Sequence, residues 1–384
     1  RKVCNVAPFA AINSAHRTIR APTPRIFSPK LKRSPMKLTK INSLNQRTRS
    51  PVNLTQLGFG GAPLGNLYRK IEDRDAQATL EAAWDAGIRY FDTAPQYGLG
   101  LSELRFADAL SRFAPEQLTL STKVGRILED CAPEDVTPEA FVGVPQKRIV
   151  FDFTYDGIMR SYADSIARLG SDKIDLLFLH DIDAGAHGQA FEDNNLRQLF
   201  SQGGYRALSE LREADRISAI GAGVNTWQIC ERLLGEADFD GFLLAGRYTL
   251  LEQDPLDTFL PLCVKRDVGI ILGGPYNSGI LATGAIEGAR YDYAPAPEDI
   301  LQRVRKLDDI CAAHNTPLIA AALQFPLGHP AVKSVIPGGS NPDEVRQNVA
   351  IFERPIPSAL WSDLKSHGLI RQDAPVPEEK FVAS

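Results

Sequence analysis

The chain has 384 residues, of which 43% are hydrophobic and 23% are charged, and its formal net charge is −4. This length suits one α/β barrel with insertions, and the composition is that of a globular protein with a large core. No apolar run reaches the roughly 18 residues of a membrane-spanning helix, so we expect no membrane partner. The scattered cysteines lack CxxC spacing, which argues against a disulfide scaffold or a zinc site, and we expect no metal.

Residues 1–35 contain basic residues but no acidic one, so the rest of the chain is more acidic than the whole. An acidic body binds polyanions poorly, and we expect no nucleic-acid partner. The basic leader has the composition either of an organellar transit peptide or of an over-extended reading frame before Met36. In both cases we expect it to be dispensable, with residues 36–384 forming the one domain. The expected location is cytoplasmic, or organellar if the leader is an import signal.

From about residue 54 the chain alternates short apolar runs with amphipathic segments. The runs predict strands at 54–61, 88–94, 118–124, 173–180, 216–224, 241–248, 268–274 and 332–339. The amphipathic segments predict helices at 75–87, 155–170, 203–215, 257–267, 297–315 and 316–328. Apolar strands that alternate with helices predict a parallel sheet covered on both faces, closed as a single-domain (β/α)8 TIM barrel. No GxGxxG follows the first strand, so a Rossmann domain is not supported.

In such a barrel the reactive side chains gather at the C-terminal ends of the strands. Asp92 ends the second predicted strand, Lys123 lies in the third and His180 ends the fourth, while Tyr97 follows Asp92 in its loop. Each has a structural explanation of its own: Asp92 as a helix cap, Tyr97 as a loop aromatic, Lys123 as a solvated strand end and His180 as a core histidine. Four ionisable groups on three neighbouring strand ends favour a catalytic site instead.

The four groups together suggest proton transfer at a substrate oxygen. An ammonium near a phenol favours the phenolate, so Lys123 is expected to lower the pKa of Tyr97, and Asp92 to hold Lys123 in place. His180 supplies a hydrogen bond that fixes a carbonyl or hydroxyl oxygen. Such a site passes a proton while another group carries a hydride.

Three motifs carry a resemblance to a known family: GIRYFDTAPQYG (87–98), STKVG (121–125) and DLLFLHD (175–181). Over residues 54–367 the chain resembles the aldo-keto reductase superfamily of NAD(P)-dependent barrel oxidoreductases. The resemblance assigns Asp92, Tyr97, Lys123 and His180 to the Tyr/Lys/Asp/His tetrad of that family.

Further stretches resemble one branch of the family, which comprises D-threo-aldose 1-dehydrogenase, L-fucose or L-galactose dehydrogenase and pyridoxal 4-dehydrogenase. They are VFDFTYDGIMRSYADSIARLG (150–170), FLHDID (178–183), IGAGVNTWQ (220–228) and GGPYNSGIL (273–281). The branch implies oxidation of the anomeric carbon of an aldose to a lactone, with hydride transfer to NAD. The alternatives are oxidation of the pyridoxal hemiacetal and a non-catalytic, nucleotide-sensing barrel subunit. Nothing in the sequence indicates an oligomeric state.

The resemblance also implies cofactor contacts. Asn225, or else Thr226, holds the nicotinamide carboxamide, and the amides of Ser278 and Gly279 face the pyrophosphate because glycine permits close approach. The last strand leads to a helix near Pro342, whose N-terminus suits a phosphate or ribose; its alternative role is a barrel-closing turn. The residues expected to contact the cofactor there are Gly338, Gly339, Ser340 and Asn348. Gly273 replaces a tyrosine that stacks on the nicotinamide in many relatives, which leaves Tyr248 or Tyr276 as stacking partners.

NADP-dependent relatives carry a Lys and an Arg where this chain has Gly338 and Glu344. A 2′-phosphate there would lose its cations and face a carboxylate, so NAD is expected to be preferred. Arg346 in the same helix is the remaining cation for NADP.

The long segment 126–154 is expected to bring polar groups to the mouth of the barrel: Glu129, Asp130, Glu134, Asp135, Lys147, Arg148 and Asp152. Carboxylates that accept hydrogen bonds from vicinal hydroxyls suit a sugar, and Asp183 adds another acceptor. The segment could also be only a solvated lid. Its Phe141, Phe151 and Phe153 would equally cover a flat pyridine ring, which keeps pyridoxal as the second substrate.

Overall fold

The protein is described by a computed structural model that covers residues 41–44, 52–171, 174–185 and 187–378. One sheet contains eight parallel strands in the order β14-β11-β10-β9-β8-β5-β4-β3. They are β3 (Phe59–Gly60), β4 (Tyr90–Asp92), β5 (Thr119–Val124), β8 (Ile174–His180), β9 (Ile217–Val224), β10 (Gly241–Ala245), β11 (Gly269–Gly273) and β14 (Val332–Ile336). Parallel bridges from Leu57 to Val335 and from Gly60 to Gly338 join the two edges, and the TIM barrel prediction is confirmed. The predicted leader, residues 1–35, lies outside the described residues.

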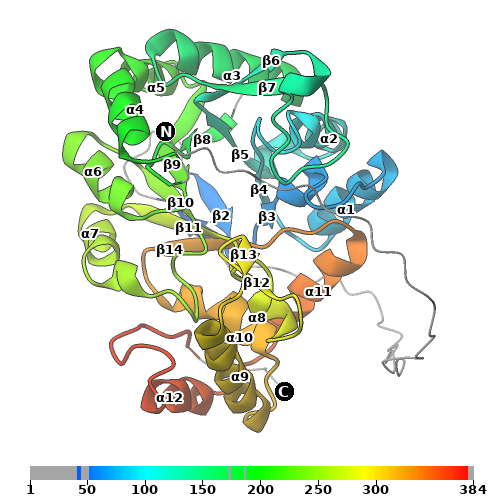
Figure 1. The fold of residues 1–384 in the computed structure, drawn as a ribbon, viewed down its shortest axis with the longest axis vertical. Helices are drawn as coiled ribbons and strands as arrows, with labels where there is room; N and C mark the ends of the chain where they lie inside the picture. The colour runs from blue at the N-terminus through cyan, green and yellow to red at the C-terminus, as the bar shows by residue number, and fades with distance from the viewer. Residues whose placement is uncertain (1–40, 45–51, 172–173, 186, 379–384) are drawn as a thin grey trace. The chain divides into compact units, whose positions relative to one another are not determined.

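Helices surround this sheet (Figure 1). Predicted segments became α1 (Asp73–Asp85), α3 (Tyr155–Leu169), α5 (Gly204–Glu213), α7 (Phe259–Arg266), α9 (Glu298–Ala313), α10 (Leu318–Gln324) and α11 (Pro342–Glu353). The structure adds α2 (Leu101–Leu110), α4 (Gln189–Ser201), α6 (Gln228–Glu236), α8 (Ile280–Thr283) and α12 (Ser358–Ser366). α11 begins beside Pro342 as predicted, because the Asn341 side chain caps it by accepting a hydrogen bond from the Glu344 amide at 2.9 Å.

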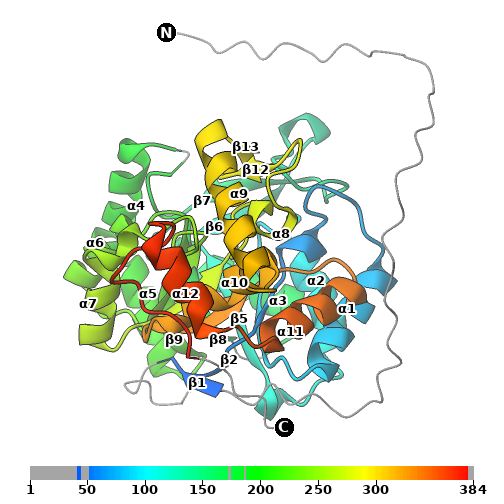
Figure 2. The same ribbon diagram turned by 90° about the horizontal axis from the view of Figure 1, so that it is seen from below.

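The first predicted strand, 54–61, is divided in the structure. Its start belongs to β2 (Asn53–Thr55), which pairs antiparallel with β1 (Ile41–Ser43), and only β3 enters the barrel. The division has a packing reason. Leu54 of β2 and Leu44 after β1 are fully buried in the cluster of side chains that fills the barrel. The β1–β2 hairpin therefore supplies apolar side chains to the barrel interior at the end opposite the strand C-termini (Figure 2).

Two apolar layers hold the barrel together. Along each strand alternate side chains point to opposite faces, so one set faces the helices and the other faces the barrel axis. The inner set includes Tyr90, Leu176, Phe178 and Ile271. The same alternation carries Asp92, two residues after Tyr90, and His180, two residues after Phe178, into the interior at the strand C-termini. The polar groups predicted to be catalytic therefore lie directly above the apolar side chains that fill the barrel interior.

Two small hairpins follow strand C-termini. β6 (Arg126–Asp130) pairs with β7 (Lys147–Phe151) after β5, and β12 (Arg290–Tyr291) pairs with β13 (Ala294–Pro295) after β11. In Figure 2, β12 and β13 lie at the end of the barrel opposite to β1. The sequence predicts a loop over 126–154, because the apolar runs at 127–128 and 149–151 are too short to predict strands. Among the described helices, none has the length and apolar character to cross a membrane.

The loop after β4 is held by close backbone contact with residues 62–65, the 3-10 turn η1 (Ala62–Gly65). Gly98 has φ +67°, and a Cβ placed on it would lie 2.3 Å from the carbonyl oxygen of Gly65. A Cβ on Gly65 would in turn lie 2.4 Å from the carbonyl carbon of Tyr97. These two glycines let the turn that presents Tyr97 pack directly on the neighbouring backbone.

Gly98→Ala should therefore destabilise the fold by at least about 2 kcal/mol, since left-handed strain and steric overlap add. The matched control is Gly170→Ala at the end of α3, where φ is +60° and no atom lies within 4 Å of the added Cβ. The control should lose only about 1 kcal/mol, the cost of the left-handed conformation alone. Urea denaturation measures both free energies of unfolding. Equal losses in the two variants would contradict the close packing at Gly98.

Candidate active site

Asp92 is the fixed anion of the site. Its carboxylate is 1% exposed and accepts hydrogen bonds from Ser121 at 2.7 Å and from the Lys123 ammonium at 2.7 Å. Ser121 is also 3.0 Å from the hydroxyl of buried Tyr90. Burial raises the pKa of Asp92, while Lys123 and both hydrogen bonds act in the opposite direction. Asp92 is thus an anchor for Lys123, and its predicted alternative as a helix cap is wrong, because its oxygens bind side chains of β5.

Lys123 lies at the centre of the group. β5 alternates, so Ser121 and Lys123 face the interior while Thr122 faces α2 and donates to Glu103 at 2.7 Å. The Lys123 ammonium donates to the Thr93 carbonyl at 2.8 Å and to the Tyr97 hydroxyl at 3.0 Å. Burial lowers the pKa of Lys123, but Asp92 and Tyr97 outweigh it and leave that pKa raised. The side chain is a buried cation, and the alternative of a solvated strand end is wrong.

The glycines of β9 make room for this cation. A Cβ on Gly223 would lie 3.2 Å from Cε of Lys123, and one on Gly221 would lie 2.6 Å from the Phe178 ring. The glycines of the ISAIGAGV run therefore leave space for Phe178 of the neighbouring strand β8 and for Lys123 of β5, the strand beyond it.

Tyr97 stands at the edge of this buried group. A turn places it: its amide donates to Ala94 O at 3.1 Å, and its carbonyl accepts from the Ser102 amide at 3.1 Å. Burial raises the pKa of Tyr97 and Lys123 lowers it, and the net pKa lies above the usual value. Lys123 acts on this pKa in the predicted direction, but burial of the phenol outweighs the ammonium. Tyr97 is consequently a phenol at neutral pH, and the Lys123 ammonium is the group placed to stabilise its phenolate, the form that accepts a proton.

His180 lies beside Tyr97, with their ring centroids 5.9 Å apart in an edge-on arrangement. It is buried, and burial together with the Arg126 and Lys123 cations holds its pKa well below the usual range. The imidazole is therefore neutral. Its Nδ1 has no hydrogen-bond partner among the residues that the structure describes, which is unusual for a histidine packed only for stability.

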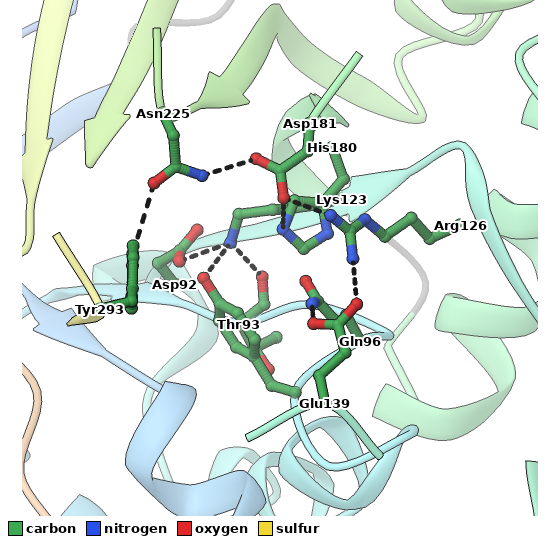
Figure 3. A network of polar contacts seen from close by, with 11 residues as sticks. Asp92, Thr93, Gln96, Lys123, Arg126, Glu139, His180, Asp181, Asn225 and Tyr293 are labelled. Carbon is green, nitrogen blue, oxygen red and sulfur yellow. Dashed lines mark hydrogen bonds and ion pairs between the residues drawn. The ribbon is translucent and has the colours of Figure 1, made fainter. Parts of the chain in front are cut away.

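A second polar network adjoins the first and was not predicted from the sequence (Figure 3). Arg126, the first residue of β6, contacts the carboxylates of Asp181 and Glu139, the latter at 3.1 Å. The side-chain amide of Asn225 donates to the other oxygen of Asp181 at 3.1 Å. The Tyr293 hydroxyl lies 3.3 Å from the side-chain oxygen Oδ1 of Asn225. Arg126 follows STKVG and Asp181 follows His180, so the strand-end rule could have found both. Tyr293 stands on the β12–β13 turn, which no strand-end rule reaches.

A cavity of about 380 Å³ opens beside this network. Its lining residues come from the five connections after β5, β8, β9, β10 and β11: Arg126, Asp181, Asp183, Gly185, His187, Asn225, Thr226, Arg247, Asp292 and Tyr293. The predicted acceptor Asp183 is among them, and it receives a hydrogen bond from Thr226 at 2.9 Å. The lining contains cationic and anionic side chains and one side-chain amide, which makes this cavity suitable for a small polar molecule.

Most of the polar residues predicted to serve the mouth have other roles. Glu129 is 3.1 Å from Arg148, Asp130 is 2.7 Å from Lys147, and Asp152 accepts from the Thr154 amide at 2.9 Å. Glu134 and Asp135 lie in an exposed turn. None of these residues lines the cavity. The antiparallel pairing of β6 and β7 sets Glu129 opposite Arg148 and Asp130 opposite Lys147, so these charges pair with one another. Of the predicted aromatics, Phe153 is fully buried, Phe151 packs on Arg126, and Phe141 lies 6.1 Å from the Tyr97 ring.

The predicted cofactor residues fall into two connected groups besides Asn225. The Tyr276 hydroxyl donates to Asn348 at 2.9 Å, which links the 276–279 turn to α11, and Asn348 also donates to Gly338 O at 3.2 Å. The Ser278 hydroxyl accepts from the Tyr293 amide at 2.9 Å. Ser340 donates its amide to Glu344 at 2.8 Å. The Tyr276–Asn348 hydrogen bond thereby joins segments 72 residues apart in the chain.

The two tyrosines considered for stacking have different surroundings. Tyr248 is fully buried against Phe325 and His329, so it packs in the core and the suggestion that it stacks on a ligand is wrong. Tyr276 is half-buried at the Asn348 contact. Tyr293 is 60% exposed above Asn225, and it is a third aromatic that the sequence did not single out.

The site thus combines the buried Lys123–Asp92 ion pair on two neighbouring strands with a phenol 3.0 Å from the ammonium. A neutral histidine lies beside the phenol. The family model for the aldo/keto reductase family matches residues 56–368. The chain belongs to the aldo/keto reductase family. It is therefore an oxidoreductase, and the expectation of an enzyme is confirmed over that of a non-catalytic subunit.

Individual relatives agree with the branch that the sequence resembled. Pyridoxal 4-dehydrogenase of Microbacterium luteolum is 46% identical and spans 84% of this chain and 96% of its own length. D-threo-aldose 1-dehydrogenase of a Pseudomonas species is 40% identical over 82% of this chain and 94% of its own. An aldo-keto reductase of Bacillus halodurans, solved in its holo form, superposes with a TM-score of 0.68 at 25% identity, covering 89% of this chain and 98% of that one.

Breaking the buried ion pair of this aldo/keto reductase should be costly. Lys123→Met leaves the Asp92 carboxylate buried without its cation, and the free energy of unfolding should fall by about 3–5 kcal/mol. The double variant Asp92→Asn/Lys123→Met removes both charges and should recover part of that loss.

The matched control is Lys147→Met, which breaks the exposed Lys147–Asp130 pair and should change stability by less than about 1 kcal/mol. Urea denaturation at neutral pH measures all three variants. A loss as small as the control's in Lys123→Met would show that Asp92 is not a buried charge.

Proposed function

We propose that this aldo/keto reductase oxidises a cyclic hemiacetal to a lactone with NAD as the hydride acceptor, and that its substrate is an aldose of the L-fucose, L-galactose or D-threo type. The observation that carries the proposal is the position of the polar cavity, which begins at Arg126 and Asp181 directly beside His180. Hydroxyl groups of a sugar would find both donors and acceptors there.

The residues of this chain divide the chemistry among them. The substrate hydroxyl lies between Tyr97 and His180; neutral His180 orients its oxygen, and Tyr97 takes its proton. NAD, when bound, accepts the hydride from the same carbon, so that a C=O bond forms and no charge is left on the substrate. Lys123 stabilises the Tyr97 phenolate, and Asp92 keeps Lys123 charged.

Residues suited to NAD stand at two places. Asn225 lines the cavity and offers its amide next to the tetrad. Glu344 is held beside Ser340 and Asn341 by hydrogen bonds of 2.8 Å to each, where its carboxylate can accept bonds from ribose hydroxyls. Arg346 is 2.5 Å from Asp343, so the cation considered for NADP is already paired. Arg69 contacts Ser340 and is 3.2 Å from Glu344, which balances that carboxylate's charge.

Pyridoxal is the second candidate, favoured by two observations. The relative at 46% identity is a pyridoxal 4-dehydrogenase. Phe141 is buried with its ring 6.1 Å from that of Tyr97, where it could cover a flat heterocycle. The cavity beyond, however, is lined by carboxylates and amides rather than by further aromatic rings, apart from His187 and Tyr293.

The test is an assay of NAD reduction with a panel of aldoses and pyridoxal, in wild type and Tyr97→Phe. We expect L-fucose or L-galactose to give the highest kcat/KM and the lactone as product. Tyr97→Phe should lower kcat by at least ~10²-fold, since it removes the proton acceptor. Because burial holds the pKa of Tyr97 above its usual value, the base form is still increasing at about pH 9, and wild-type kcat/KM should climb from about pH 7 to about pH 9 without levelling off.

Each outcome of this assay bears on a separate part of the proposal. A higher kcat/KM for pyridoxal than for every aldose would replace the substrate and leave the mechanism standing. Near-normal turnover in Tyr97→Phe would remove Tyr97 from its role.

Cofactor choice gives a further prediction. NAD should exceed NADP by at least about tenfold in kcat/KM, about 1.4 kcal/mol, because the 2′-phosphate would meet Glu344. Glu344→Gln should lower the ratio of kcat/KM with NAD to kcat/KM with NADP, because it raises kcat/KM with NADP. Glu116→Gln, an exposed carboxylate in the turn Pro115–Gln117 that precedes β5, is the control and should leave it unchanged. Steady-state kinetics with both cofactors measures the ratio, and equal or better kinetics with NADP in wild type would refute the preference.

A further inference from the structure

Arg126 is an unusual residue for the mouth of a barrel because its side chain is almost fully enclosed. The residue is 4% exposed, and its guanidinium lies over the Phe151 ring at 5.1 Å. Removing a charge from water is costly unless its donors are used. The terminal nitrogens contact Glu139 and Asp181, yet Nε has no partner among the described residues. Because Nε is itself buried, a ligand in the cavity would contact the terminal nitrogens of this enclosed cation.

Asp181 joins this cation to the reacting groups. Its Oδ2 contacts Arg126 and lies 3.8 Å from Nε2 of His180, while its Oδ1 accepts from Asn225. The residue has φ +45°, a conformation that non-glycine residues adopt at a cost, and its amide is held by Gly223 O at 2.9 Å. One strained carboxylate therefore touches the residue that orients the reacting oxygen, the buried cation and the amide proposed for the nicotinamide.

The charges around Arg126 determine what kind of group it can bind. Two carboxylates, Asp181 and Glu139, surround one guanidinium, and His180 is neutral. The Glu139 carboxylate is also held by Gln96. An anion entering here would meet a net negative group, whereas a neutral hydroxyl can accept from Arg126 and donate to Asp181.

We propose that Arg126 and Asp181 form the subsite for the hydroxyl on the ring carbon next to the one that is oxidised. The inference rests on the proposed function and specifies its substrate: a vicinal diol, with one oxygen between Tyr97 and His180 and its neighbour between Arg126 and Asp181. The shared Asp181 Oδ2 brings the two oxygen sites together. A site built to bond a hydroxyl strongly rejects analogues that lack it.

The experiment compares L-fucose with 2-deoxy-L-fucose in wild type, Arg126→Met and Arg126→Lys. Wild type should prefer L-fucose by at least ~10²-fold in kcat/KM. That preference should fall at least ~10-fold in Arg126→Met, and less in Arg126→Lys, which keeps one donor. Arg148→Met is the matched control, since Arg148 is half-exposed on β7, pairs with Glu129 and lines no part of the cavity. If the role of Arg126 is purely structural, its substitution should lower kcat/KM for L-fucose and for 2-deoxy-L-fucose by the same factor.

A second measurement does not depend on turnover or on the variants' stability. Calorimetry with NADH-bound wild type compares binding of the L-fucose lactone with that of its 2-deoxy analogue, and we expect at least ~10-fold weaker binding of the latter. Turnover of aldoses with no discrimination against the 2-deoxy compounds overturns the subsite and leaves the proposed function. Selective binding of the 2-hydroxy lactone without turnover supports the subsite and contradicts the proposed function. Equal binding of the two lactones overturns the subsite whatever the kinetics.

Discussion

The buried ion pair between Lys123 and Asp92 is the interaction on which the site depends. Both side chains are 1–2% exposed and lie 2.7 Å apart, so each requires the other to remain charged. Each partner is held by further hydrogen bonds: Asp92 accepts one from Ser121, and Lys123 donates to the Thr93 carbonyl and to the Tyr97 hydroxyl. Burial alone would make the Tyr97 phenolate very costly. The Lys123 ammonium, 3.0 Å from the Tyr97 hydroxyl, reduces this cost.

The barrel makes this pair possible because its interior is filled with apolar side chains below and leaves space above. Tyr90 and Phe178 form part of this apolar filling, and each is followed two residues later by a residue of the candidate active site, Asp92 or His180. Strand pairing fixes the register, since Asp92 is opposite Ser121 and Lys123 is opposite Phe178. The small inward residues of β9 complete the arrangement, because a larger side chain at Gly223 would crowd Lys123.

Around this core a second network links what would otherwise be separate functions. Asp181 touches Arg126, Asn225 and the surroundings of His180, so the groups suited to a hydroxyl, an amide and a reacting oxygen share one carboxylate. The turn that carries Tyr293 closes the same network from another strand connection, with its own amide bonded to Ser278. Changes at any of these positions should therefore be felt at the others, as expected for residues in one hydrogen-bonded network.

The sequence by itself predicted the barrel, which the structure confirms, and it singled out Asp92, Tyr97, Lys123 and His180, which the structure brings together. Buried parallel strands read as continuous apolar runs, and functional groups at strand ends stand out against them, as Asp92 and His180 do. It did not determine where short elements form. The apolar runs of β6 and β7 are too short for the sequence to show that the two strands pair, and this pairing sets Glu129 and Asp130 opposite Arg148 and Lys147. The net pKa of Tyr97 was decided by tertiary structure too, since the sequence shows the ammonium but not how deeply the phenol is buried. Arg126, Asp181 and Tyr293 meet only in three dimensions, because burial and mutual distance, rather than residue type, make them a site.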